Sequence, residues 1–190
     1  MTATPQLTTD LQKLVLEVED DLRDRLDADS ERSRDWREEH EQAVRARRTA
    51  MAWTTWRDDR IVQAAVSWVL TTVFVRFAED NELIAPSWFT GPGERRHHAV
   101  EAQQAFFREH PELTDREWIE QSFEHLRNIP ATAGLVDEHA GLRLISPSGQ
   151  MATRILEFWR RIGDDGALVH DLVDPELSTR FLGDLYQDLS

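Results

Sequence analysis

The sequence predicts an all-α protein, an irregular multi-helix bundle, on three observations. Apolar residues recur at helical spacing through most of the chain. Residues that cap helices stand before several of these apolar runs, and Pro or Gly residues separate them. The chain also lacks internal repeats and low-complexity tracts, so a repeat architecture is not expected.

The length predicts one globular domain. A chain of 190 residues fits one domain, or one domain with a helical arm, and is long enough to bury a core. We expect a single domain over residues 1–190. Within it, residues 1–56 would form N-terminal helices that could extend as an arm, and residues 57–190 would form the helical core.

The first two predicted helices differ in their apolar faces. A row of apolar residues keeps one face from Leu7 to Leu26, and Thr9 with Gln12 has the spacing of a capping box. A helix is therefore predicted from about Thr9 to about Leu26. Residues 30–53 are charged on most sides and carry only a thin apolar line, which predicts a solvated helix.

Residues 58–84 contain the most apolar part of the chain, and residues 61–78 are apolar nearly all round. A membrane span needs ~20 predominantly apolar residues, and here a polar stripe interrupts the helix while Arg76 breaks its end. The stripe consists of Gln63, Ser67 and Thr71. We therefore expect a buried central helix and no membrane contact.

Three shorter helices are predicted in the second half, over residues 94–109, 115–128 and 148–162. Thr114 and Glu117 have the spacing of a capping box at the start of the second. A different pattern separates the last two helices. Between residues 133 and 145, two short apolar runs surround a Gly-containing turn, which predicts a small β-hairpin.

The last helix is predicted over residues 174–190, because Asp174 can cap it and Pro175 suits the first helical position. Its apolar face consists of Phe181, Leu182, Leu185, Tyr186 and Leu189. Gly183 costs ~1 kcal/mol of helix propensity, which predicts close packing or a bend. Because no Gly stop, basic last turn or polar tail follows, we expect this face to contact a further domain or a second copy of the chain, as a homodimer.

Charge and residue usage restrict the function. Lys and Arg number 22 and Asp and Glu 36, so the net charge is −14, which argues against a nucleic-acid footprint over the whole surface. The absence of Cys excludes disulfides and thiolate metal sites. The N-terminus lacks the basic and apolar regions of a signal peptide, and a cytoplasmic location is expected.

No complete catalytic or metal motif is present. His40 and Glu41 begin a zinc-protease HExxH motif, but Val44 occupies the second ligand position. Glu94 and His97 have the spacing of a di-iron helix, but no second Glu-x-x-His pair exists. The chain also lacks a Walker loop, a nucleophile elbow, and the loops that hold the cofactor and base in adenine methyltransferases. We expect no catalytic, cofactor-binding or metal-binding residue here.

One stretch is a candidate DNA-binding surface, because arginines alternate with tryptophans between residues 45 and 60. Phosphate contacts with stacking partners need these residue types. The candidates are Arg45, Arg47, Arg48, Trp53, Trp56, Arg57 and Arg60. The alternative, which we favour, is structural: the tryptophans would lie in the core, and the arginines would pair with Asp and Glu of neighbouring helices.

Acidic residues crowd residues 164–190, where Arg180 is the one basic residue. Such a run is usually a solvated face. It could also meet a basic partner surface or imitate the phosphates of DNA.

Two segments resemble a known family. Residues 144–190, which begin LISPSGQMATRILEFWRRIGDDG, closely resemble the region just before the catalytic domain of the PglX family. These proteins are the adenine-specific DNA methyltransferases of BREX phage-defence systems. Residues 67–84, SWVLTTVFVRFAEDNELI, are similar to the central N-terminal helix of the family, most of all in its type 2 (phage growth limitation) branch.

The resemblance implies an N-terminal helical domain that ends before the methyltransferase domain. The parent protein would use S-adenosylmethionine to methylate N6 of adenine in host DNA, while this part would hold no cofactor. Implied partners are the methyltransferase domain, other BREX components and duplex DNA. Related fused restriction enzymes carry an N-terminal nuclease, which needs a catalytic lysine on a strand, and the only lysine here is Lys13 in a predicted helix.

Three functions remain open at this point. The leading one is a non-catalytic scaffold or docking domain of a BREX methyltransferase. The second is a DNA-contacting module that uses the Arg/Trp stretch. The third is an independent acidic interaction protein, such as a DNA mimic.

Overall fold

The computed structural model describes residues 5–129, 132–174 and 180–189. The fold is all-α, as predicted, and the described residues form α-helices and two short 3-10 helices without a strand. The elements are α1 (Pro5–Ala28), α2 (Ser30–Arg45), α3 (Trp53–Asp80), α4 (Arg95–Glu109), α5 (Asp115–Arg127), η1 (Ala133–Leu135), η2 (Gly141–Arg143), α6 (Gly149–Arg160) and α7 (Arg180–Leu189).

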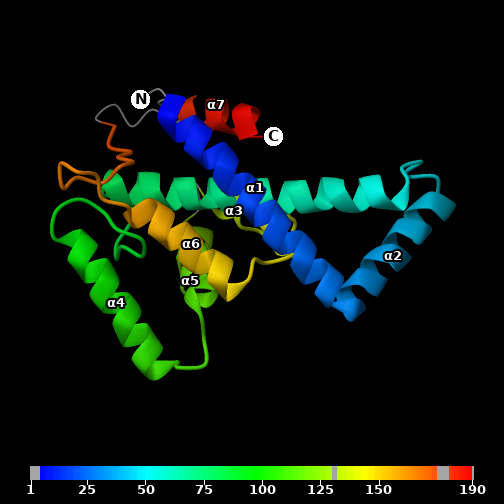
Figure 1. Cartoon of the computed structure of the whole chain (residues 1–190), viewed down its shortest axis with the longest axis horizontal. Coiled ribbons are helices and arrows are strands. Elements are labelled where there is room, and N and C mark those ends of the chain that lie inside the picture. Colours follow the sequence, from blue (N-terminus) through cyan, green and yellow to red (C-terminus); the bar gives the residue numbers. More distant parts are fainter. Residues whose placement is uncertain (1–4, 130–131, 175–179, 190) are drawn as a thin grey trace.

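The long helix α3 is the axis of the molecule (Figure 1). Helix α1 crosses it, and α2 returns from the end of α1 to the start of α3, so these three helices enclose a triangle. Helices α5 and α6 pack on the other half of α3, α4 lies at the far end, and α7 lies beside the start of α1.

Helix α3 is buried through most of its length, as predicted for the central helix. Trp68, Val69, Val73 and Val75 have no exposed surface. Among the described helices, α3 is long and apolar enough to cross a membrane, but 78% of its most apolar window is buried inside the protein. Burial of that surface against neighbouring helices is the main favourable contribution to folding here.

The apolar row of α1 belongs to the same core, since Leu11, Val18, Leu22 and Leu26 are fully buried. The start of α1 differs from the prediction. The helix begins at Pro5 rather than near Thr9, and the Thr9 hydroxyl donates to the carbonyl of Pro5 at 2.9 Å. A hydroxyl that bonds back one turn lies inside a helix, so Thr9 is not the cap.

Residues 133–145 do not form the predicted hairpin; they form η1, η2 and connecting turns. The reason lies in α3. The Ser67 hydroxyl accepts from the backbone N–H of Leu142 at 3.0 Å, and the Trp68 indole donates to the Leu142 carbonyl at 3.0 Å. Because α3 side chains satisfy these backbone groups, the segment does not need an opposing strand.

Candidate functional site

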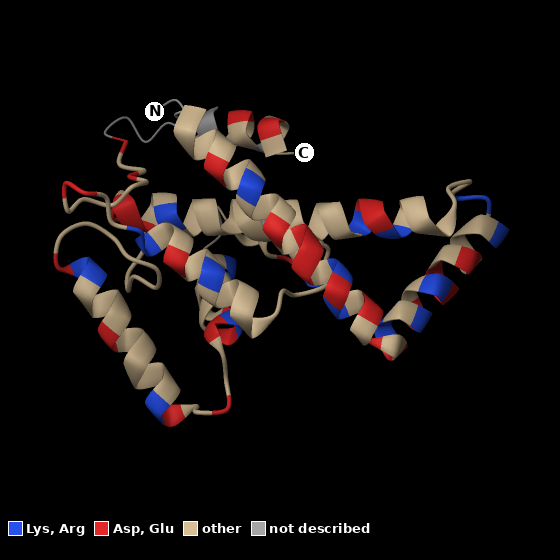
Figure 2. Cartoon of the chain, viewed as in Figure 1, with Lys and Arg blue, Asp and Glu red and all other residues tan. Residues whose placement is uncertain are grey.

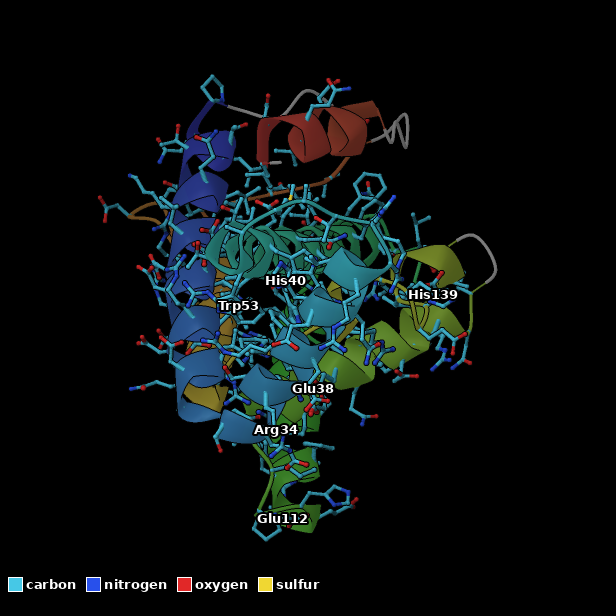
Figure 3. All side chains as sticks on the ribbon, turned by 90° about the vertical axis from the view of Figure 1, so that its right-hand side faces the viewer. Arg34, Glu38, His40, Trp53, Glu112 and His139 are labelled. Carbon is cyan, nitrogen blue, oxygen red and sulfur yellow. The ribbon has the colours of Figure 1, made fainter. Side chains whose placement is uncertain are left out.

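The predicted basic and aromatic stretch lies at the corner where α2 meets α3, at the right-hand end of Figure 1. We call residues 36–60 the α2–α3 corner. Four aromatic rings pack there. The centroid of the His40 ring lies 5.8 Å from that of Trp53 and 5.4 Å from that of Trp56, and the centroids of Trp36 and Trp56 lie 6.3 Å apart. Figure 3 shows His40 and Trp53 close together across the two helices. These ring contacts join α2 to the start of α3.

Several arginines of the stretch are occupied by neighbours. Arg60 lies over the Trp56 ring at 4.2 Å and pairs with Glu39 at 2.8 Å. Arg57 pairs with Asp58 at 2.8 Å, and Arg45 pairs with Glu41 at 3.0 Å. The Arg60–Glu39 pair joins neighbouring helices, as the structural alternative expects. The other two pairs each lie within one helix.

Arg47 and Arg48 differ from the other arginines of the corner. Both are exposed in the turn after α2, and neither has an ion pair within the described part of the chain. The loop that carries them is blue in Figure 2. The structure therefore brings the candidate residues together but leaves only these two with an unpaired charge.

A second group of interacting residues was not predicted from the sequence. It is a buried polar network at the C-terminal end of α3, made of Arg76, Glu79, Asp80 and Asn81. The Arg76 guanidinium donates to both Asp80 carboxylate oxygens, at 2.7 and 2.8 Å. Arg76 and Glu79 have no exposed surface, and Asp80 is 6% exposed. We call these four residues the α3 polar network.

The network fixes two segments that are distant in sequence. The Glu79 carboxylate accepts the backbone N–H groups of Trp88, Phe89 and Thr90, at 2.6, 2.9 and 3.0 Å. Asp80 accepts from the backbone N–H of Leu172 at 2.9 Å. The 84–93 turn and the 161–174 segment are thereby both attached to the end of α3.

Burial raises the pKa of the Glu79 carboxyl, and the backbone donors Phe89 and Thr90 and the Arg76 charge oppose this only in part. Burial raises the pKa of Asp80 in the same way, against the Arg76 charge. A cavity of about 270 Å³ adjoins Asp80 and Gly91–Gly93, but the Asp80 oxygens already accept from Arg76 and Leu172. The contacts of the network are with side chains and backbone groups of the same chain.

One sequence signal could have revealed this network. The run Arg76–Asn81 places charged and amide side chains at the end of a segment that is apolar nearly all round. Most sides of such a segment are expected to be buried, so polar residues within it need partners.

The predicted apolar face of the last helix is partly covered. Leu185 is 0% exposed and Leu189 is 8% exposed, because α7 packs on α1 and α3 of the same chain. The expectation of an open face is corrected at these two positions. The side chains of Phe181, Leu182 and Tyr186, like residues 175–179, lie outside the described part of the structure. Their contact with another domain stays a prediction.

The described residues contain no group of three His, Cys, Asp or Glu side chains arranged to hold a metal ion. His97 and His98 are exposed at the first turn of α4. They belong neither to the α2–α3 corner nor to the α3 polar network.

The adenine-specific methyltransferase PglX of Streptomyces coelicolor is 42% identical to this chain over 97% of the chain. The resemblance to the PglX family is confirmed. The chain spans 16% of the length of PglX from S. coelicolor, so the match concerns a small part of that relative. No family profile matches the chain. No solved structure matches it either.

Proposed function

We propose that this chain is a non-catalytic helical scaffold domain of an adenine-specific DNA methyltransferase of the BREX type. The observation that carries the proposal is the match to PglX, which covers 97% of this chain and 16% of the relative. On this proposal, the part of the protein outside the matching segment carries out catalysis. On this proposal the whole protein binds S-adenosylmethionine and works in the cytoplasm with other BREX components.

The fold supports a scaffold role. Nucleotide-type cofactors are commonly held where a strand of a parallel sheet meets a glycine-rich turn, and the described residues contain no sheet. The buried contacts instead join distant segments, for example through Glu79 and Asp80. A rigid helical body of this kind can position a neighbouring domain.

Titration calorimetry tests the absence of catalysis. We expect no heat of binding when S-adenosylmethionine is added to the chain, and no methylation of duplex DNA. Saturable heat with a stoichiometry near one would contradict the proposal.

A chimera tests the scaffold role. In the S. coelicolor relative, the matching segment is deleted in one variant and replaced by this chain in another. We expect the deletion to abolish adenine methylation and the replacement to restore it. The control is a replacement that carries Arg76→Ala, which should not restore methylation. Full methylation by the deletion variant would contradict the scaffold role.

A second candidate function is contact with duplex DNA through the α2–α3 corner. The observation that favours it is the pair of exposed charges at Arg47 and Arg48, which have no ion pair among the residues that the structure describes. A local basic site can bind phosphate although the chain as a whole carries a net charge of −14.

Fluorescence anisotropy with a short duplex at several salt concentrations tests this contact. We expect Arg47→Gln combined with Arg48→Gln to weaken binding and to reduce the log–log salt slope by about 2. Arg108→Gln, at an exposed arginine of α4, is the control and should change little. The absence of binding at low salt would rule this candidate out.

A further inference from the structure

A polar cleft of about 840 Å³ lies between the elbow that joins α1 to α2 and the start of α5. The elbow contributes Arg25 and residues 28–32, and Arg143, Ile145 and Ser146 line the other side. Four arginines from three parts of the chain line the cleft: Arg25, Arg32, Arg116 and Arg143. None of them belongs to the stretch that the sequence predicts as a binding surface.

Arg25 is the unusual member of this group. Its side chain is half-buried, its Nε atom is buried without a hydrogen-bond partner, and its guanidinium has no ion pair within the described residues. The chain has 36 acidic against 22 basic residues, so carboxylate partners are abundant elsewhere. The Nε atoms of Arg60 and Arg76 also lack a hydrogen-bond partner, but both of these side chains form ion pairs. A buried charged donor without an acceptor is costly, and Arg25, which has neither, indicates an acceptor that the described residues do not supply.

The carboxylates of the cleft already have donors. Glu117 accepts from the backbone N–H of Thr114 at 2.8 Å and from Arg116 Nε at 2.9 Å. Asp29 caps α2 by accepting from the backbone N–H of Arg32 at 3.0 Å. Glu120 accepts from a serine hydroxyl at 3.2 Å, and Glu31 is exposed. None of these carboxylates is a partner of Arg25.

The cleft is lined by four carboxylates as well as four arginines, and among these arginines Arg25 is the one without an ion pair in the described structure. Arg32 and Arg116 lie in the first turns of α2 and α5, whose N-terminal ends carry partial positive charge. The planar fork of a guanidinium matches the oxygens of a phosphate group, to which it can donate two parallel hydrogen bonds.

We propose that this cleft binds a phosphate group, with Arg25 as the principal donor and Arg32, Arg116 and Arg143 around it. The phosphate can belong to a nucleic-acid backbone or to a free phosphate-bearing molecule, because the same chemistry recognises both. This inference concerns the chain alone and does not depend on its place in a methyltransferase.

NMR titration of the chain tests the proposal at constant ionic strength. The probes are inorganic phosphate in one series and a short DNA duplex in the other, with sodium chloride as the reference anion. We expect saturable shifts of the Arg25 Nε–H and of the backbone amides of Ser30 and Glu31. Binding followed through these amides should weaken at least fivefold in Arg25→Gln.

Two further variants complete the design. Arg108→Gln removes the same charge from an exposed position on α4 and should leave the apparent dissociation constant unchanged. Arg25→Lys keeps the charge but lacks the fork, so its affinity should fall between those of the wild type and Arg25→Gln. If Arg25→Gln fails to fold, Arg25→Lys tests the contribution of Arg25 in its place.

The two series separate the two sources of phosphate. Shifts with inorganic phosphate support a free phosphate-bearing ligand, and shifts with the duplex alone support a nucleic-acid backbone. If neither probe shifts these resonances beyond chloride, or if Arg108→Gln weakens binding as much as Arg25→Gln, the proposal is overturned. Water would then be the acceptor of Arg25.

Discussion

At the residue scale, a single buried side chain fixes the backbone of a turn. Glu79 accepts three backbone N–H groups of the 84–93 turn, and its side chain has no exposed surface. A buried donor that loses its acceptor costs about 1–3 kcal/mol. The 84–93 turn therefore depends on the Glu79 carboxylate for three of its backbone hydrogen bonds.

We predict that Glu79→Ala lowers the free energy of unfolding by about 3 kcal/mol or more, because three buried N–H groups lose their acceptor. Glu79→Gln keeps one acceptor oxygen and should lose less. Urea unfolding followed by circular dichroism measures both. Glu101→Ala, at an exposed position on α4, is the control and should stay within about 0.5 kcal/mol of the wild type. Equal losses for Glu79→Ala and Glu101→Ala would contradict this account.

His170 predicts a dependence of stability on pH. Burial lowers the pKa of its imidazole, and the Asp10 carboxylate at 3.1 Å offsets this only in part, while Arg161 and Arg76 also oppose protonation. The unfolded chain then binds a proton more readily than the folded chain. Stability should therefore be complete above the ordinary His pKa of 6.5 and should fall as the pH drops below that value.

Thermal unfolding between pH 7.5 and pH 5 measures this effect, and His170→Gln supplies the comparison. The variant should lose stability less steeply over this interval, because it has no imidazole to protonate. Parallel curves for the two proteins would show that His170 is not the responsible group.

At the element scale, the two glycines near helix ends have opposite roles. Gly149 begins α6, and a Cβ atom there would lie 2.8 Å from Cβ and Oγ1 of Thr114, at the start of α5. Gly183 in α7 has open space instead, since no described atom lies within 4 Å of the position of its Cβ. Of the two expectations at Gly183, close packing is not met among the described atoms, and a bend stays a prediction.

We predict opposite effects for the same substitution at these two glycines. Gly149→Ala should destabilise by about 1–3 kcal/mol, because the Thr114 side chain and the backbone must shift. Gly183→Ala should stabilise by about 0.5–1 kcal/mol through helix propensity and reduced freedom of the unfolded chain. Chemical denaturation checks both signs, and destabilisation at both positions would mean that α7 packs more tightly at Gly183 than described.

At the scale of the whole molecule, α7 closes the fold against the first helix of the chain. Gln12 of α1 donates to the carbonyl of Asp188 at 3.2 Å, and Leu185 is fully buried. The two ends of the described chain are therefore joined in one core (Figure 1). Loss of this contact would expose apolar surface of α1 and α3 together.

We predict that Leu185→Ala lowers the free energy of unfolding by about 2–5 kcal/mol, as for other fully buried leucines. The variant should also self-associate more than the wild type, because α7 docks less firmly. Sedimentation velocity measures association and also tests the expected homodimer of the wild type. Gln187→Ala, exposed on the same helix, is the matched control. A Leu185→Ala protein as stable as this control would contradict the docking of α7.

The sequence by itself determined the helical class, the central helix and the capping box at Thr114, which the structure has with Glu117 as partner. These features depend on residues within one or two helical turns, so spacing along the chain is enough to predict them. The resemblance to the PglX family likewise came from contiguous residues, and the 42% identity to S. coelicolor PglX confirms it.

Only the tertiary structure decided which polar groups meet. Asn81 accepts from the backbone N–H of Asp174, 93 residues away, and Ser67 accepts from Leu142, 75 residues away, which removes the need for a hairpin. The burial of Leu185 also follows from segments distant in the chain, since α7 packs on α1 and α3. The spacing of residues along the chain does not predict such pairs, because the partners of a buried group depend on how distant segments pack in three dimensions.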